Sequence, residues 1–183
     1  MSHTSSQYEL GEILLSAEEI AEVVGRLGRE ICADYERKQP VLVNLLKGGV
    51  VFLADLMRQM TIPHHIDFLN VSSYGNNTSS SGVVRIVQDL SSNIEGRHVL
   101  VVEDVIDSGR TLTYIFNMLR LRSPKSLEVC ALLRKPPALK SGISMKYVGK
   151  DIPSVFVVGY GLDYQENFRN LPYIAKLLHY KNL

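Results

Sequence analysis

The chain has 183 residues, of which 45% are hydrophobic and 21% are charged. This length and composition suit one globular domain, residues 1–183, with a sizeable core. The formal net charge of +1 excludes a bulk electrostatic field that would hold the protein on a nucleic acid or an anionic membrane. The sequence shows no apolar run long enough to span a membrane and no signal-peptide pattern at its start.

The two cysteines are predicted to be reduced core residues. Cys32 and Cys130 lie in apolar contexts, and they form neither a CxxC pair nor part of a Cys/His metal quartet. Reduced cysteines predict a cytoplasmic protein, and the balanced charge predicts no nucleic-acid partner and no membrane partner.

The first predicted element is a helix that follows a polar N-terminal tail. Ser16 and Glu19 have the spacing of a capping box, and apolar residues then recur every three or four positions to about residue 35. One face of this helix should be buried and the opposite face solvated.

Strands and helices alternate along the rest of the chain. Apolar runs that end at glycine or polar turns mark the strands, and amphipathic stretches mark the helices. We predict strands at 40–46, 65–72, 82–89, 98–102, 127–133 and 155–159, and helices at 50–60 and 110–121. This alternation predicts an α/β domain with a mostly parallel central sheet and helices on both faces.

An acidic turn at 103–109 has the strongest chemical signal. It follows a buried strand and carries Glu103, Asp104 and Asp107 before Ser108 and Gly109 open a helix. Backbone N–H groups at a helix N-terminus bind phosphate, whereas carboxylates suit sugar hydroxyls or a divalent cation. The alternative is an ordinary N-capping turn, which accounts for one or two carboxylates but not for three.

The segment Val101–Thr111 resembles the phosphoribosyl pyrophosphate motif of type I phosphoribosyltransferases. Segments 46–49, 73–74, 133–135 and 156–164, together with Arg169, are similar in order and spacing to those of hypoxanthine-guanine phosphoribosyltransferases. The resemblance implies the fold of that family, with a small hood subregion beside the central sheet. It also implies a homo-oligomer, dimeric or tetrameric, and Mg²⁺-dependent transfer of phosphoribosyl from phosphoribosyl pyrophosphate to hypoxanthine or guanine in purine salvage.

The resemblance assigns residues to each part of the site. Asp107 would be catalytic, as acceptor of a purine proton, and the peptide before Lys47 would be cis. Glu103, Asp104 and Asp163 would hold metal, and the purine would be bound by Lys135, Phe156, Val157 and Asp163. Phosphoribosyl pyrophosphate would be bound by Lys47, Gly48, Ser73, Tyr74, Glu103, Asp104, Asp107, Ser108, Gly109, Arg110, Thr111 and Arg169.

Two other functions are weaker. A regulator on the same fold that binds RNA or an effector nucleotide would be expected to lack an intact purine pocket, whereas Lys135, Phe156 and Asp163 are all present. A nucleotide-binding phosphotransferase would need a GxxxxGK[ST] or GxGxxG loop, and the sequence has neither. The polar segment 73–81 is predicted to be a lid over the site, with a passive linker as the alternative.

Overall fold

The computed structural model describes residues 8–73, 84–136 and 142–179. Tyr74 and most of the predicted lid, residues 74–81, lie outside these ranges. Within them, the chain forms a six-stranded sheet, a three-stranded sheet and three α-helices.

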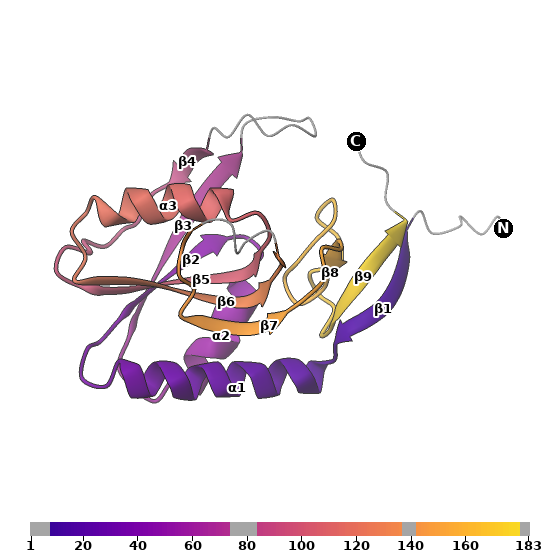
Figure 1. The fold of residues 1–183 in the computed structure, drawn as a ribbon, viewed down its shortest axis with the longest axis horizontal. Coiled ribbons are helices and arrows are strands. Elements are labelled where there is room, and N and C mark those ends of the chain that lie inside the picture. The colour runs from indigo at the N-terminus through magenta and orange to yellow at the C-terminus, as the bar shows by residue number, and fades with distance from the viewer. Residues whose placement is uncertain (1–7, 74–83, 137–141, 180–183) are drawn as a thin grey trace.

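The larger sheet is mostly parallel, as the sequence predicts. Its order is β4-β3-β2-β5-β6-β7, and only β4 runs antiparallel to its neighbour. Figure 1 shows the parallel strands pointing toward one edge of the sheet. The strands are β2 (Val41–Leu46), β3 (His65–Ser73), β4 (Val84–Gln88), β5 (His98–Ile106), β6 (Ser126–Arg134) and β7 (Tyr147–Asp151).

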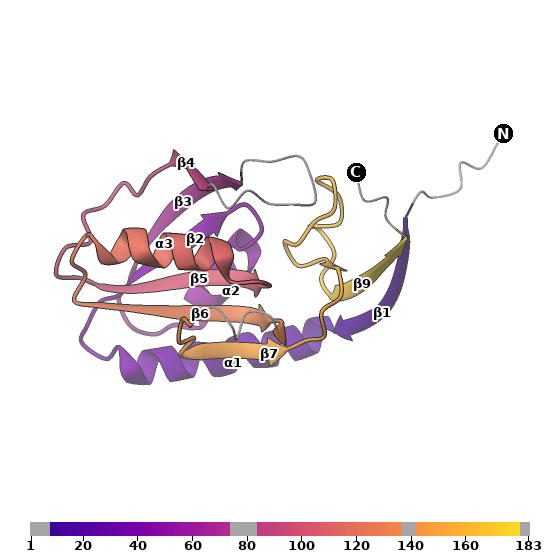
Figure 2. The same cartoon turned by 45° about the horizontal axis from the view of Figure 1, so that its top comes forward.

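Helices cover both faces of this sheet. Helices α1 (Ala17–Asp34) and α2 (Val50–Gln59) bury apolar side chains in one core with Leu42, Leu100 and Leu132 of the sheet. Helix α3 (Arg110–Arg120) packs on the opposite face, as Figure 2 shows. Strands covered on both faces are buried throughout, which explains why they appear in the sequence as continuous apolar runs.

The predicted start of α1 is confirmed. The Ser16 hydroxyl accepts a 3.2 Å hydrogen bond from the Glu19 amide, and the Glu19 carboxylate accepts a 2.8 Å hydrogen bond from the Ser16 amide. The helix buries Ile20, Val24 and Ile31. This reciprocal cap satisfies two of the N–H groups that a helix start leaves without partners.

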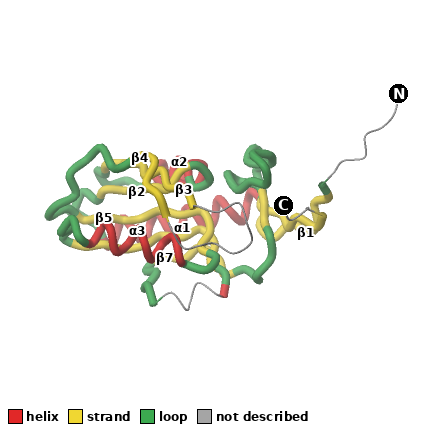
Figure 3. Tube along the Cα trace, turned by 90° about the horizontal axis from the view of Figure 1, so that it is seen from above, coloured by secondary structure: helices red, strands yellow, loops and turns green. Residues whose placement is uncertain are grey.

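The second sheet lies beyond the carboxyl ends of the parallel strands (Figure 1), and Figure 3 shows its strand β1 (Glu9–Leu15) set apart from the strands of the larger sheet. The second sheet has the order β1-β9-β8, with antiparallel pairing of β1, β9 (Ile174–His179) and the short β8 (Val157–Val158). It corresponds to the expected small hood. The polar N-terminal tail was predicted too long, because residues 9–15 form β1.

The acidic segment also differs from its prediction. Strand β5 continues to Ile106, so Glu103 and Asp104 are strand residues rather than turn residues. Among the residues that the structure describes, no helix combines the length and apolar character that crossing a membrane requires.

Candidate active site

Three parallel strands end side by side where the predicted site residues lie. Lys47 follows β2, Asp107 follows β5, and Lys135 follows β6. Strand β5 pairs in parallel with both β2 and β6, so the three carboxyl ends meet at one edge of the sheet. Ligands bind at this edge in open parallel sheets. Ser73 is the last residue of β3, the other neighbour of β2.

One cavity, of about 340 Å³, lies between this edge and the small sheet. Its walls come from the strand ends, from β8 and from the segment between β8 and β9. It is lined by Lys47, Gly48, Asp104, Val105, Asp107, Lys135, Phe156, Val157, Leu162, Asp163 and Arg169. The structure therefore brings together nine of the predicted site residues from distant parts of the chain.

An adjoining cavity of about 210 Å³ lies at the N-terminus of α3 and shares Val105 and Asp107 with the first. Gly109 occupies the N-cap position with a φ of 72°, a conformation that glycine adopts without a Cβ penalty. None of the three carboxylates therefore caps this helix, which argues against an ordinary capping turn. The cavity is lined by Glu103, Val105, Ile106, Asp107, Ser108, Gly109, Arg110, Thr111 and Leu112.

Lys135 and Asp107 form an ion pair inside the site. The Lys135 ammonium donates a 2.8 Å hydrogen bond to Asp107 Oδ2, and the Lys135 side chain is 9% exposed whereas that of Asp107 is 60% exposed. The Lys135 amide also donates to the Ile106 carbonyl at 3.0 Å. A buried donor and a more accessible acceptor thus stand side by side in the first cavity.

Asp104 and Glu103 are carboxylates in an unfavourable environment for negative charge. Burial raises the pKa of Asp104 to about 6, and burial together with the Asp104 charge raises the pKa of Glu103 well above its ordinary value. The carboxylate of Asp104 accepts a 2.7 Å hydrogen bond from the Val105 amide. Because a nearby cation would stabilise both charges, the pair suits a cationic ligand.

The donor set fits Mg²⁺ that is shared with a substrate. Among the described residues, no three acidic, His or Cys side chains lie close enough to form an all-protein metal site. Mg²⁺ usually keeps several waters and takes one or two carboxylates together with substrate phosphates. Glu103 and Asp104 offer such a partial set, since Glu103 lines the cavity at α3 and Asp104 lines the first cavity.

The segment between β8 and β9 packs its backbone directly onto the loop after β2. Gly161 has a φ of 96°, and a Cβ added there would collide with the Gly48 carbonyl. A Cβ at Gly48 would in turn collide with the Asp104 carboxylate. The peptide between Leu46 and Lys47 is cis, as the family resemblance implies. These glycines allow three segments of the site to approach one another.

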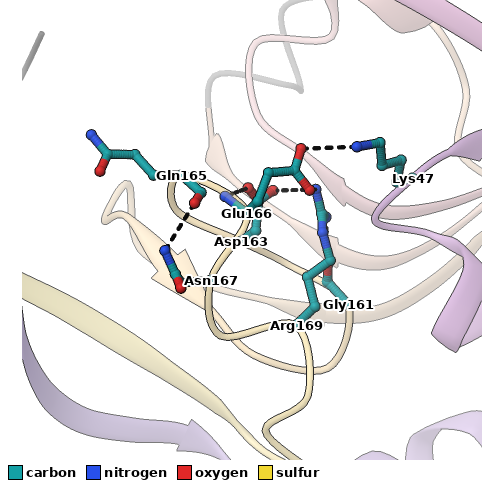
Figure 4. Close-up of polar contacts among 7 residues, drawn as sticks. All are labelled: Lys47, Gly161, Asp163, Gln165, Glu166, Asn167 and Arg169. Carbon is teal, nitrogen blue, oxygen red and sulfur yellow. Dashed lines mark hydrogen bonds and ion pairs between the residues drawn. The ribbon is translucent and has the colours of Figure 1, made fainter.

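Arg169 is held within this segment by backbone and side-chain oxygens (Figure 4). Its Nη1 donates to the Gly161 carbonyl at 2.7 Å, and its Nη2 lies 2.9 Å from Asp163 Oδ1. Nη2 also donates to Glu166 Oε2 at 3.2 Å, and the Lys47 ammonium donates to Glu166 Oε1 at 3.0 Å. The hydrogen bonds from Lys47 and Arg169 lower the pKa of Glu166. The sequence analysis did not single out Glu166, although it lies between two predicted residues.

Phe156 and Val157 form the wall on the side of the small sheet. Val157 is 5% exposed and pairs with Lys176 of β9, while Phe156 is half-buried and meets Tyr164 edge-on at 5.6 Å between ring centroids. An aromatic ring therefore lines the cavity that also contains the Lys135 and Asp107 pair.

Known proteins are similar to this chain in sequence and in structure. A family model described as phosphoribosyl transferase domain matches residues 11–165. A hypoxanthine-guanine phosphoribosyltransferase of Dictyostelium discoideum is 48% identical over 170 residues, which cover 91% of this chain and 94% of that protein. The chain belongs to the hypoxanthine-guanine phosphoribosyltransferase family.

Longer relatives and solved structures agree with this membership of the family. The bifunctional protein TilS/HprT of Listeria innocua is 46% identical over 173 residues, which are 94% of this chain but 27% of that protein. The crystal structure of a hypoxanthine phosphoribosyltransferase from Staphylococcus aureus superimposes with a TM-score of 0.88 at 47% identity, covering 92% of each chain. The fold is thus that of the type I phosphoribosyltransferases, and the predicted fold class is confirmed.

Proposed function

We propose that the chain is a single phosphoribosyltransferase domain that acts in purine salvage. It transfers the phosphoribosyl group of phosphoribosyl pyrophosphate to N9 of a 6-oxopurine, hypoxanthine or guanine, and releases IMP or GMP with pyrophosphate. Family membership supports the reaction. The observation that carries the choice of base is the ion pair between Lys135 and Asp107.

This pair matches one edge of a 6-oxopurine. The O6 atom is an acceptor, and the neighbouring N7 carries a donor in the tautomer whose N9 is free to attack. A lysine ammonium has only donors and an ionised carboxylate only acceptors, so Lys135 would bind O6 and Asp107 would take the N7 proton. Adenine presents an amino donor in place of O6 and would leave Lys135 without an acceptor. Phe156 would stack on the base, and the Val157 backbone would bind its edge.

The sugar donor would bind across both cavities. Ser108, Gly109, Arg110 and Thr111 would hold the 5'-phosphate at the N-terminus of α3, where N–H groups and the helix dipole favour anions. Lys47, Gly48 and Arg169 would bind the pyrophosphate, with Ser73 and Tyr74 closing over it. Glu103 and Asp104 would contact the ribose hydroxyls.

Glu103 and Asp104 would also hold Mg²⁺ through its water shell, and Asp163 would help to hold a second ion. The metal neutralises charge on the departing pyrophosphate when bound. In the reaction, the bond from ribose C1 to the pyrophosphate oxygen breaks with its electron pair leaving on that oxygen. The bond from C1 to N9 forms, and Asp107 receives the purine proton. Positioning and charge stabilisation would therefore supply most of the rate enhancement.

We further propose a cytoplasmic homo-oligomer, dimeric or tetrameric. Two free cysteines, Cys32 and Cys130, support a reducing compartment. Size-exclusion chromatography with light scattering would determine the oligomeric state, and cell fractionation would determine the location.

The test of the reaction is nucleotide formation. The purified protein is mixed with Mg²⁺, phosphoribosyl pyrophosphate and hypoxanthine, guanine, xanthine or adenine in turn, and products are followed by absorbance and chromatography. We expect IMP or GMP with equimolar pyrophosphate and almost no product from adenine. If none of the four bases gave a nucleotide, the proposed reaction would be wrong.

A further inference from the structure

Glu166 joins two cations that come from separate segments of the chain. Its Oε1 accepts from Lys47 at 3.0 Å, and its Oε2 accepts from Arg169 at 3.2 Å. Figure 4 shows the carboxylate lying between the two cationic groups. One anionic side chain therefore bridges both cations.

The position of Glu166 is fixed by the backbone conformation and the hydrogen bonds of its own loop. Gln165 and Glu166 have φ values of 51° and 62°, in the left-handed region that residues other than glycine adopt infrequently. The Glu166 amide donates to Asp163 Oδ2 at 2.9 Å, and the Asn167 side chain donates to the Gln165 carbonyl at 2.9 Å. These local hydrogen bonds hold the turn that directs the Glu166 carboxylate toward Lys47.

The same two cations line the cavity that would receive the pyrophosphate group. A diphosphate oxygen and the Glu166 carboxylate would compete for the same donors, above all for Arg169 Nη2, which Glu166 already shares with Asp163. The side chains of Lys47 and Glu166 are each 65% exposed. An ion pair in such an exposed setting is weak, so a polyanionic ligand can displace the carboxylate from Lys47.

We propose that Glu166 competes with the pyrophosphate group for Lys47 and Arg169, and so weakens donor binding and promotes release of product pyrophosphate. This inference rests on the proposed function, because it assigns the anion that Lys47 and Arg169 bind. The opposite role is that Glu166 positions the two cations for the ligand. The two roles predict opposite signs for the effect of removing the charge.

The decisive variant is Glu166→Gln, which keeps the size of the side chain and removes its charge. We expect the KM for phosphoribosyl pyrophosphate and the inhibition constant of pyrophosphate both to fall by about two- to tenfold, the range set by the loss of two weak ion pairs, one with Lys47 and one with Arg169. The KM for the purine should not change. Since salt screens exposed charges, the difference from the unmodified protein should shrink as ionic strength rises.

Glu30→Gln is the matched control, because Glu30 forms an exposed ion pair with Arg26 on α1 at 2.9 Å and lines neither cavity. It should leave all of these constants unchanged. Isothermal titration calorimetry with inorganic pyrophosphate, with and without Mg²⁺, measures the same effect without turnover. It therefore tests the inference even if no nucleotide forms.

Tighter pyrophosphate binding by Glu166→Gln, with Glu30→Gln unchanged, supports competition. Unchanged binding would overturn it, and weaker binding would overturn it in favour of a positioning role. Failure of the unmodified protein to turn over any purine would count against the proposed reaction alone.

Discussion

The Tyr160 hydroxyl donates a 2.7 Å hydrogen bond to Asp55 Oδ2 and thereby joins the two segments that carry the cations of the site. Asp55 lies on α2, which begins just after Lys47, and Tyr160 adjoins the turn that leads to Arg169. Tyr160 is 6% exposed. Burial, reinforced by the bond to Asp55, raises the pKa of its hydroxyl, so the hydroxyl remains a donor at neutral pH.

Tyr160→Phe should weaken binding of the sugar donor. The variant removes only the hydroxyl, so the apolar packing remains while the link between α2 and the Arg169 segment is lost. We expect the unfolding free energy to fall by about 1 kcal/mol, and the KM for phosphoribosyl pyrophosphate to rise while that of the purine is unchanged. Denaturant unfolding and steady-state kinetics measure these effects.

Tyr147→Phe is a matched control for this prediction. Its hydroxyl also donates to an aspartate, Asp34 Oδ2, at 2.7 Å, but it lines neither cavity of the site. It should lose similar stability with no change in the KM for the donor. Equal kinetic changes in both variants would reduce the role of Tyr160 to general stability.

Asp107→Asn should mainly lower kcat. The amide cannot accept a proton as a carboxylate does, and general base contributions are on the order of a hundred- to ten-thousand-fold. Asp89→Asn removes an exposed carboxylate that pairs with Arg122 and should retain full activity. Near-normal turnover by Asp107→Asn would exclude Asp107 as the base.

Lys135→Ala should relax the discrimination between oxo and amino purines. Without the ammonium, hypoxanthine loses its partner at O6 and adenine no longer meets a mismatched donor, so the ratio of their kcat/KM values should fall. Lys146→Ala removes another lysine paired with an aspartate, Asp34, at 2.9 Å, and should preserve the ratio. An unchanged ratio in Lys135→Ala would remove this lysine from the base site.

Gly48→Ala should abolish most activity, because its Cβ would collide with the carboxylate of Asp104. Gly25→Ala is the contrasting change: on α1 its Cβ would meet Arg29 Nη1 at 3.5 Å, an ordinary contact. That variant should remain active, and its free energy of unfolding should rise by up to about 1 kcal/mol, because alanine has a higher helix propensity than glycine. Full activity in Gly48→Ala would contradict the close packing.

Asp67→Asn should make the free energy of unfolding less dependent on pH in the acidic range. Burial alone would raise the pKa of Asp67, but hydrogen bonds from Phe68, Ser91 and Ser92 outweigh it and hold the pKa below the ordinary value of an aspartate. A lowered folded pKa contributes stability that is present above the unfolded pKa and is lost as the pH falls through the folded value. Urea unfolding should show the largest deficit of the variant at neutral pH, and the two stabilities should converge as the pH falls below the ordinary pKa of an aspartate and through the lowered folded pKa of Asp67. A constant deficit at all pH values would contradict this account.

Local chemistry explains which parts of the site the sequence could predict. The segment 101–111 carries its carboxylates, hydroxyls and glycine close together in the sequence. Its binding chemistry could therefore be predicted without knowledge of the fold. Lys135, Phe156 and Arg169 carry no such local signal and were assigned only through the family resemblance. Glu166 was missed because its side chain is directed toward the site by a left-handed turn at two residues that are not glycine, which the sequence does not signal.

The central strands were predictable because burial on both faces leaves apolar runs. Strands β1 and β9 were not, since they pair across the length of the chain, with irregular register and no hairpin signal. Strand β7 was missed as well, since it contains Gly149 and Lys150 and lies at the sheet edge. The stretch from 120 to 150 is rich in lysine and arginine. Arg122, Lys146 and Lys150 are partly exposed partners of acidic residues, whereas Lys135 is buried in the site.

The pairing in the small sheet affects the order in which the parts of the site can form during synthesis of the chain. This sheet pairs residue 9 with residue 179, so β1 cannot pair until β9 has been synthesised. Strand β8, which carries Val157, pairs with β9 and therefore also has no neighbour until β9 has been synthesised. The large sheet and the N-terminus of α3 can therefore form before β8 gains this neighbour. The proposed purine site, whose wall carries Val157, would then be completed after the proposed phosphate site.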